Sequence, residues 1–344
     1  MTSKIWKATI LTMNEKLKPL FSFVLRFGLS IVLLWLIFYF QKIDPGKILN
    51  ALKSADLNYI VMAGIVFLAI NFILLFRWFI YVRALELTVP LSVVTRYFFI
   101  GLFGNLLLPT AIGGDVVKIL GLCQYSERSS QKPKVVASVL LDRLSGFAGI
   151  VVTAIAAFIF GFQLINSLTL LIAIVLLALL SIFIGALLFN ELVFSFCCQI
   201  FNRLPKIKQS LMNLHYDIAL LKGRQSALYQ AVGLSVLAQV IAAIFFFLVG
   251  KALHENIALI YFLIFTPLVA VACSLPSIGG LGPREGALGF LLGTISTIGK
   301  EAGASIGVSM GLINFFFMVL VGLIGGLVYL FTKDVRPTGA KTHC

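Results

Sequence analysis

The sequence predicts an all-α polytopic membrane protein with about eight transmembrane helices, in which re-entrant or broken helices form two related halves. The 344 residues are 60% hydrophobic and only 12% charged, and the mean hydropathy is +1.06. Soluble domains carry roughly 25% charged residues. In addition, two similar segments rich in Gly and Pro interrupt apolar stretches, at about 93–120 and 274–298. We therefore expect one transmembrane domain over residues 1–344.

The individual spans follow from the length of the apolar stretches, because about 20 residues of helix cross the hydrocarbon. The first stretch follows a basic N-terminus and is longer than the apolar core of about 7–15 residues in a signal peptide, which predicts an uncleaved anchor. The candidate spans are 20–40, 59–81, 135–160, 167–190, 226–250, 257–273 and 303–331.

The orientation follows from the Lys and Arg residues of the loops, which are more frequent on the cytoplasmic side. The basic stretches 118–134 and 191–225 are predicted inside, and the uncharged turn 161–166 outside. The N-terminus is then cytoplasmic. A cytoplasmic C-terminus requires an even number of crossings, so we expect one more crossing within 284–300.

Within the second basic stretch, residues 195–222 alternate apolar and basic positions at near-helical spacing. This pattern predicts an amphipathic helix on the cytoplasmic interface. The alternative is an ordinary polar loop.

Composition also excludes several function classes. The net charge of +14 lies beside apolar stretches, which favours anchoring to anionic lipid over nucleic-acid binding. The five cysteines are scattered without CxxC spacing, so no metal site and no cofactor is predicted. The longest polar segment, of about 35 residues, is too short for an independent core. A phosphate-binding GxxxxGK[ST] motif is missing from the sequence.

The two interrupted segments resemble one another: "LPTAIGGDVVK" (108–118) and "LPSIGGLGPRE" (275–285). Proline breaks a helix and glycine permits unusual backbone conformations. Interrupted helices at corresponding places of two halves indicate a transport site. The alternatives are a chance similarity and a kink without a site. The predicted loop-forming residues are Pro109, Gly113 and Gly114 in the first segment, and Pro276, Gly279, Gly280, Gly282 and Pro283 in the second.

The second segment carries the more specific chemistry. Gly282 is predicted to be the N-cap and Pro283 the first residue of a helix that begins at the Arg284–Glu285 pair. The helix amides and the Arg284 guanidinium would suit a phosphate. In the first segment, Asp115 can cap the following helix or face a basic group, and Lys118 lies one turn on.

A third charged pair, Asp142 and Arg143, lies inside the apolar stretch that begins at Val135. Each charge would cost about 2.5–3.5 kcal/mol at the bilayer centre, so each needs a partner or water. Adjacent helical residues point about 100° apart, so we expect the partners on other helices. The available pairs are Asp115 with Arg143 or Arg284, and Asp142 with either arginine. The alternative is that these charges only hold helices together or lie at a solvated edge.

Several other residues are assigned structural roles. Arg77 and Arg83, at the end of the second candidate span, are expected to extend toward the interface. The asparagines Asn105 and Asn314 are expected to bond between helices, and the glycines at 303, 307 and 311 to bring two helices close together.

The stretches "FFIGLFGNLLLPTAIGGDVVKIL", "VVASVLLDRLSG" and "SIGGLGPREGALG" resemble the signature blocks of the lysylphosphatidylglycerol synthase transmembrane-region family, over about residues 15–332. This family includes the flippase domain of the multiple peptide resistance factor. The resemblance implies a polytopic fold with re-entrant helices in a bacterial cytoplasmic (inner) membrane. It also implies lipid movement between leaflets and functional charges at Asp115, Asp142, Arg143, Arg284 and Glu285.

The expected function is therefore that of a lipid flippase rather than an enzyme, since the chain ends at Cys344 without the aminoacyl-transferase domain of the resistance factor. The expected partners are membrane lipids, either an anionic phospholipid or a polyprenyl-phosphate lipid, with a possible homo-oligomer or a separate lipid-synthesis enzyme. Two alternatives stay open: a membrane-embedded transferase acting on a lipid-linked donor, and an accessory subunit of a lipid-synthesis enzyme.

Overall fold

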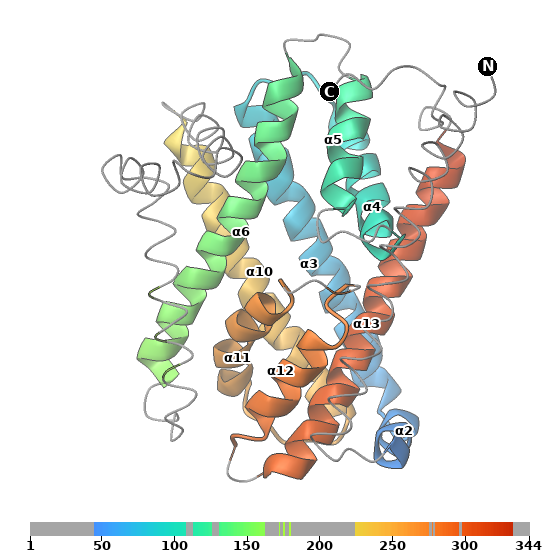
Figure 1. The fold of residues 1–344 in the computed structure, drawn as a ribbon, viewed down its shortest axis with the longest axis vertical. Coiled ribbons are helices and arrows are strands. Elements are labelled where there is room, and N and C mark those ends of the chain that lie inside the picture. The colour runs from blue at the N-terminus through green and yellow to red at the C-terminus, as the bar shows by residue number, and fades with distance from the viewer. Residues whose placement is uncertain are drawn as a thin grey trace, which may run out of the picture.

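The computed structural model describes residues 45–107, 113–125, 131–161, 224–274, 277, 279–295 and 298–332, together with the single positions 172, 175 and 179. In these residues the structure is all-helical (Figure 1). The helices are α2 (Pro45–Lys53), α3 (Leu57–Ala84), α4 (Leu91–Leu107), α5 (Gly113–Tyr125), α6 (Lys132–Gly161), α10 (Gln225–Ala252), α11 (Leu259–Ala272), α12 (Pro283–Leu292) and α13 (Lys300–Phe331).

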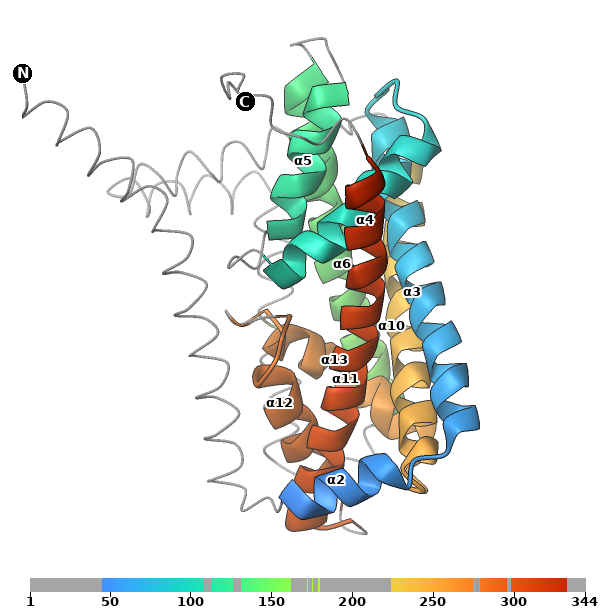
Figure 2. The ribbon, with the colours of Figure 1, turned by 90° about the vertical axis from the view of Figure 1, so that its right-hand side faces the viewer.

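The helices form two halves with the same order of long, short, short and long: α3–α6 and α10–α13. In the first half, α4 runs from the upper end of the molecule to about mid-height and α5 returns to the upper end. In the second half, α11 and α12 make the corresponding excursion from the lower end (Figures 1 and 2). The two halves therefore run in opposite directions, which is an inverted repeat.

The packing follows the same repeat. The two short helices of each half contact one another, and the first of them packs on the last long helix of the other half. Thus α4 contacts α13, and α11 contacts α6. The long helices α3 and α10 contact one another. The predicted division into two related halves is confirmed by this arrangement.

The short helices end where the sequence contains Gly and Pro. Helix α4 ends at Leu107, just before "LPT", and α12 begins at Pro283. Two expectations about spans are therefore wrong. The stretch 257–273 contains the 14-residue α11, which at 1.5 Å per residue is only about 21 Å long. The expected crossing within 284–300 is replaced by the 10-residue α12, which turns back toward the lower end.

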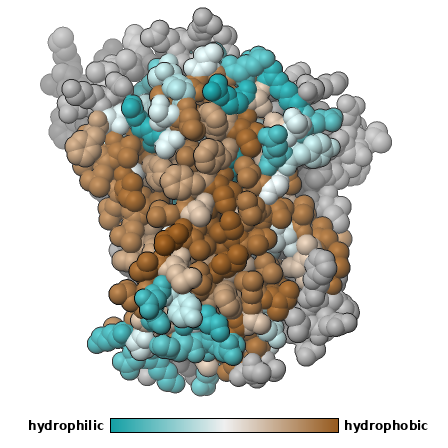
Figure 3. Space-filling view, turned by 180° about the vertical axis from the view of Figure 1, so that it is seen from behind, coloured by the Kyte–Doolittle hydropathy of each residue, from teal (hydrophilic) through white to brown (hydrophobic). Residues whose placement is uncertain are grey.

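Four of the described helices are long and apolar enough to cross a membrane: α3, residues 132–157 of α6, α10 and α13. Their outer side chains are apolar; for example, Ile65, Phe72 and Leu327 are largely exposed. On the rear face, a broad hydrophobic band separates polar zones at the two ends (Figure 3). The protein is thus a multi-pass membrane protein. The candidate spans 20–40 and 167–190, the segment 195–222, Pro109 and Pro276 lie outside the described residues. The expected count of eight spans is therefore not confirmed, and these two further spans stay predictions.

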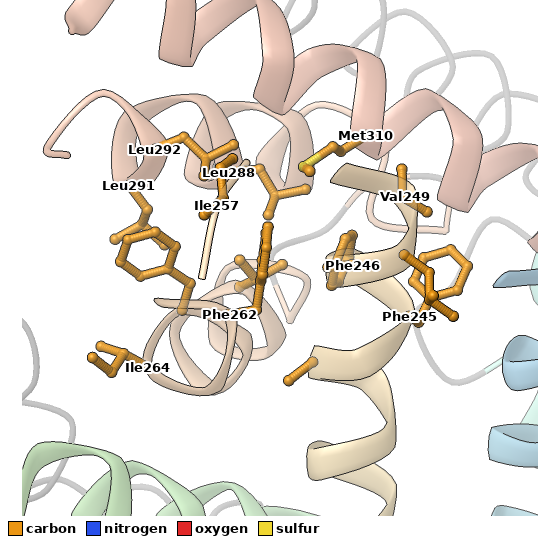
Figure 4. Packing of buried hydrophobic residues seen from close by; sticks show 14 of the residues in the cluster. Phe245, Phe246, Val249, Ile257, Phe262, Ile264, Leu288, Leu291, Leu292 and Met310 are labelled. Atoms are coloured by element: carbon orange, nitrogen blue, oxygen red, sulfur yellow. The ribbon is translucent and has the colours of Figure 1, made fainter. Parts of the chain in front are cut away.

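Each half contains its own apolar core. One core joins α10–α13, where Phe246 of α10, Phe262 of α11 and Leu288 of α12 point toward one another (Figure 4). The other joins α3–α6 around Trp78 and Phe98. The polar side chains described below lie beside these two cores.

Candidate functional site

The start of α5 brings an amide cap and a carboxylate together near mid-height. The Asn105 side chain at the end of α4 accepts a hydrogen bond from the Gly114 amide, with 2.8 Å between Oδ1 and N. Asp115 lies in the first turn of α5, and its carboxylate pairs with Arg143 of α6. Of the two roles open to Asp115, the structure shows the second: it faces a basic group, and Arg143 is the one of its two expected partners that it contacts. Asn105 binds the amide at the helix start instead.

Close contact between α4 and α5 depends on glycine. A Cβ atom added to Gly114 would collide with the Gly101 carbonyl oxygen and with the Asn105 side chain. A Cβ atom on Gly104 would lie 3.0 Å from a methyl carbon of Val117. The small residues at this contact let the two backbones meet and bring Asn105 within reach of the start of α5.

Asp142 is paired with Arg77, which was expected to extend toward the interface. Arg77 Nε of α3 donates to Asp142 Oδ1 at 2.7 Å, and its Nη1 donates to Ser235 Oγ of α10 at 3.1 Å. Arg77 and Asp142 are 9% and 7% exposed. The expectation that Arg77 extends to the interface is therefore wrong, and Arg143 and Arg284 do not pair with Asp142. Arg83, one and a half turns on, is exposed as expected.

Gly146, one turn after Asp142, makes room for this pair. A Cβ atom at Gly146 would lie 3.1 Å from Arg77 Nη1. The sequence pattern "DRLSG" (142–146) could have indicated that Asp142 has a large cationic partner. A small residue one turn from a buried carboxylate leaves room for such a cation to approach. Ser235 had no comparable signal in the apolar sequence of α10.

Lys118 lies one turn after Asp115 but contacts aromatic rings. Its Nζ is 4.7 Å from the centre of the Phe98 ring and 5.0 Å from that of Trp78, and the side chain is buried. Aromatic faces attract cations, most strongly where water is excluded. The cluster of Arg77, Asp115, Lys118, Asp142 and Arg143 thus joins α3, α5 and α6, with three positive and two negative formal charges. We call it the α5 cluster.

The start of α12 has the predicted cap. Gly282 is the N-cap with φ of 96°, and Pro283 is the first helical residue. The Glu285 carboxylate reaches back to accept a hydrogen bond from the Gly282 amide at 2.6 Å. Gly279 and Gly280 also have positive φ values, of 57° and 80°, so the predicted loop-forming role of these glycines fits their conformation.

Every nitrogen of the Arg284 guanidinium has a partner at this turn. Nε and Nη2 donate to Glu285 Oε1 at 3.1 and 2.8 Å, and Nη1 donates to Asn314 Oδ1 of α13 at 2.6 Å. Arg284 is 4% exposed and Glu285 is fully buried. These adjacent residues pair because they lie in the first turn, where the carboxylate folds back over the helix end. We call Arg284, Glu285 and Asn314 the α12 cluster.

Glycines hold α12 against α13, as the spacing predicts. A Cβ atom at Gly303 or Gly307 would collide with the backbone of Gly293 or Gly289, and one at Gly311 would lie 2.7 Å from Glu285 Cγ. The start of α12 is therefore fixed by backbone contacts along α13 as well as by its polar cluster.

The structure does not join the two clusters through an ion pair, since Asp115 pairs with Arg143 and Arg284 pairs with Glu285. Accessibility separates them: the Arg143 side chain is 41% exposed, whereas that of Arg284 is 4% exposed. Residue 143 lies eleven positions along α6, about 17 Å from its start. An accessible guanidinium within a candidate membrane span needs a polar surrounding rather than hydrocarbon.

The sequence as a whole matches a family model, the lysylphosphatidylglycerol synthase TM region, over residues 23–322. The chain belongs to this family. It is also 28% identical over 116 residues to a UPF0104 membrane protein of Pyrococcus horikoshii. This match covers 33% of the chain and 34% of the relative, so the chain spans about a third of the relative's length. No solved structure matches the chain.

In this member of the lysylphosphatidylglycerol synthase TM family, both clusters lie within the matched residues. No group of three or more His, Cys, Asp or Glu side chains suited to a metal ion occurs in the described part of the chain. The two clusters consist of cation–carboxylate pairs, amide groups and aromatic rings.

Proposed function

We propose that this protein moves a lipid with a phosphate-bearing head group across the cytoplasmic membrane, and that the phosphate contacts Arg143 in the α5 cluster. One observation carries the proposal: Arg143 is the accessible member of a charged cluster whose other members are buried, and it lies within the candidate membrane span 132–157. A lipid keeps its acyl chains in the bilayer, so only its head group needs such a polar place.

The role of each residue follows from its contacts. Arg143 offers guanidinium donors to a phosphate, and Asp115 orients it from the first turn of α5. Lys118 adds positive charge close by, and Arg77 with Asp142 fixes α6 against α3. Arg284 was expected from the sequence to hold phosphate. Its guanidinium is bonded to Glu285 and Asn314, so in this conformation we assign the phosphate contact to Arg143 rather than to Arg284.

The inverted repeat supports transport rather than simple lipid binding. In secondary transporters, inverted halves built from interrupted helices place the substrate at the interface of the two halves. Here α4–α5 and α11–α12 would act as re-entrant pairs that enter from opposite leaflets. The basic upper end, with residues such as Lys132, Lys134 and Arg224, would face the cytoplasm.

Proteoliposomes containing phosphatidylglycerol with a fluorescent acyl chain test the proposal, with dithionite bleaching as the measure of exchange between leaflets. Arg143→Ala should slow the exchange at least tenfold, and Arg143→Lys should retain part of it. Arg83→Ala is the matched control, because Arg83 is exposed at the end of α3 and outside the cluster. Wild-type exchange in Arg143→Ala overturns the proposal, and a chemically altered lipid in the mass spectrum indicates a transferase instead.

A further inference from the structure

A cavity of about 620 Å³ lies at the lower end of the bundle, where α11 begins and α12 ends. It is bounded by α2, the connection between α10 and α11, and the first turns of α13. Its volume falls in the range of small-molecule sites. This end is distant from the α5 cluster: α2 crosses the bottom of the bundle, whereas α5 lies in the upper half (Figure 2).

Four charged side chains from three elements line the cavity. They are Lys47 of α2, Glu255 of the α10–α11 connection, and Lys300 and Glu301 of α13. Among the described residues, no salt bridge links any of these four side chains to an opposite charge. Two cations and two carboxylates thus share one cavity with their charges available, and their formal sum is zero.

The rest of the lining is suited to a lipid at the membrane boundary. Leu253 and Ile306 contribute apolar surface to the cavity. Helix α2 lies across the bundle end, with Ile48 buried beneath it and Leu49 exposed. This placement is typical of helices that lie in the interface plane. A head group in the cavity could therefore keep its acyl chains alongside the apolar band.

We propose that this cavity binds a zwitterionic phosphate–ammonium group, the head group of an aminophospholipid, with Lys47 and Lys300 on the phosphate and Glu255 and Glu301 on the ammonium. An anionic lipid would satisfy the lysines and leave two carboxylates facing its negative charge. A zwitterion satisfies both signs at once. Burial raises the pKa of Glu255 because it disfavours the charged carboxylate. An ammonium group beside Glu255 would supply the opposite charge and so favour the ionised form.

Native mass spectrometry of the full chain tests this assignment, with dihexanoyl phosphatidylethanolamine and dihexanoyl phosphatidylglycerol as probes. The wild type should bind the ethanolamine lipid at least fivefold better. Glu255→Gln with Glu301→Gln should abolish this preference, and Lys47→Gln with Lys300→Gln should weaken both lipids. The phosphate–ammonium group could belong to a lipid or to a soluble molecule, and soluble phosphoethanolamine distinguishes the two. If it displaces the lipid at an equal concentration, the ligand of the site is soluble. If it does not displace the lipid, the ligand is the lipid.

Two controls keep the result specific. Lys251→Gln changes a lysine near the same end that bonds Asn256 rather than lining the cavity, and should bind both lipids as the wild type does. Equal binding of the two lipids by the wild type, or unchanged preference in the glutamine variants, overturns the proposal. Binding at this cavity is independent of transport at Arg143. The Arg143→Ala variant should therefore retain the preference for the ethanolamine lipid, whether or not this variant moves lipid.

Discussion

The starts of α5 and α12 occupy corresponding places in the two halves, yet their charged residues are arranged differently. At α5 the carboxylate and the arginine come from different helices, and the Arg143 side chain is 41% exposed. At α12 the two residues are neighbours in sequence, and the Arg284 side chain is 4% exposed. An ion pair between helices can open without unfolding either helix, whereas a pair within one helical turn helps to fix that turn. We therefore expect ligand contact at the first pair and structural support at the second.

The first expected effect concerns the support of α12. Gly307→Ala should destabilise the protein by about 3 kcal/mol or more, because the new Cβ atom collides with the Gly289 backbone, which has no side-chain freedom to yield. Heating followed by size-exclusion chromatography measures the loss. Gly233→Ala is the control, since nothing lies within 4 Å of its added Cβ atom, and helix propensity alone should stabilise it slightly.

The next effect concerns the buried pair behind the α5 cluster. Asp142→Asn should cost about 3–5 kcal/mol, because it leaves the Arg77 guanidinium buried without its counter-charge. The double variant Arg77→Met with Asp142→Leu should recover much of that loss in the same thermal assay. Glu86→Gln, which weakens exposed ion pairs with Lys134 and Arg224, should cost at most about 1 kcal/mol. If Asp142→Asn were as mild as Glu86→Gln, the pair would not be buried as described.

A smaller effect compares the two arginines directly. Arg284→Met should lower stability by about 2–4 kcal/mol, since it leaves the buried Glu285 carboxylate without its cation. Arg143→Met should lower stability less, by about 1–2 kcal/mol, because its side chain is partly solvated, but it should abolish lipid exchange. Thermal midpoints measure the stability of both variants, and dithionite bleaching measures their lipid exchange. A larger loss of stability in Arg143→Met than in Arg284→Met would contradict the distinction between the two helix starts.

The smallest effect is a pH dependence at the lower end. Burial raises the pKa of Glu255, so the folded state binds its proton more readily than the unfolded state does. The stability contributed at this position should therefore rise as the pH falls through the raised pKa, and decline as the pH rises. Amide exchange in residues 253–257 at pH 5 and pH 7 measures it, with Glu255→Gln as the variant that should lose the difference.

The sequence was sufficient for the class of fold, the interruptions and the α12 cap. Those features depend on local chemistry: apolar length, Pro at the first helical position, and glycine where φ is positive or backbones touch. The predicted spacing of glycines on α13 was likewise confirmed by its contacts with α12.

The partners of the charged residues could not be predicted as well. The pairing of Asp142 with Arg77 joins residues 65 positions apart, and its choice over Arg143 depends on how α3 and α6 are rotated toward each other. The accessibility of Arg143, which now distinguishes it from Arg284, is also a property of the packed bundle. Local patterns identify which charges need partners, but only the packing determines which partner each receives.

Helix α13 touches both excursions along a single rod of 32 residues. Near its start the glycines at 303 and 307 meet the backbone of α12, and near its end Gly325 meets the Phe99 carbonyl oxygen of α4. Helix α13 is thus a shared support, with a glycine contact surface for one short helix pair toward each of its ends. A shift of either short pair along α13 would change its offset from the other pair, so this one helix fixes the spacing between the two pairs.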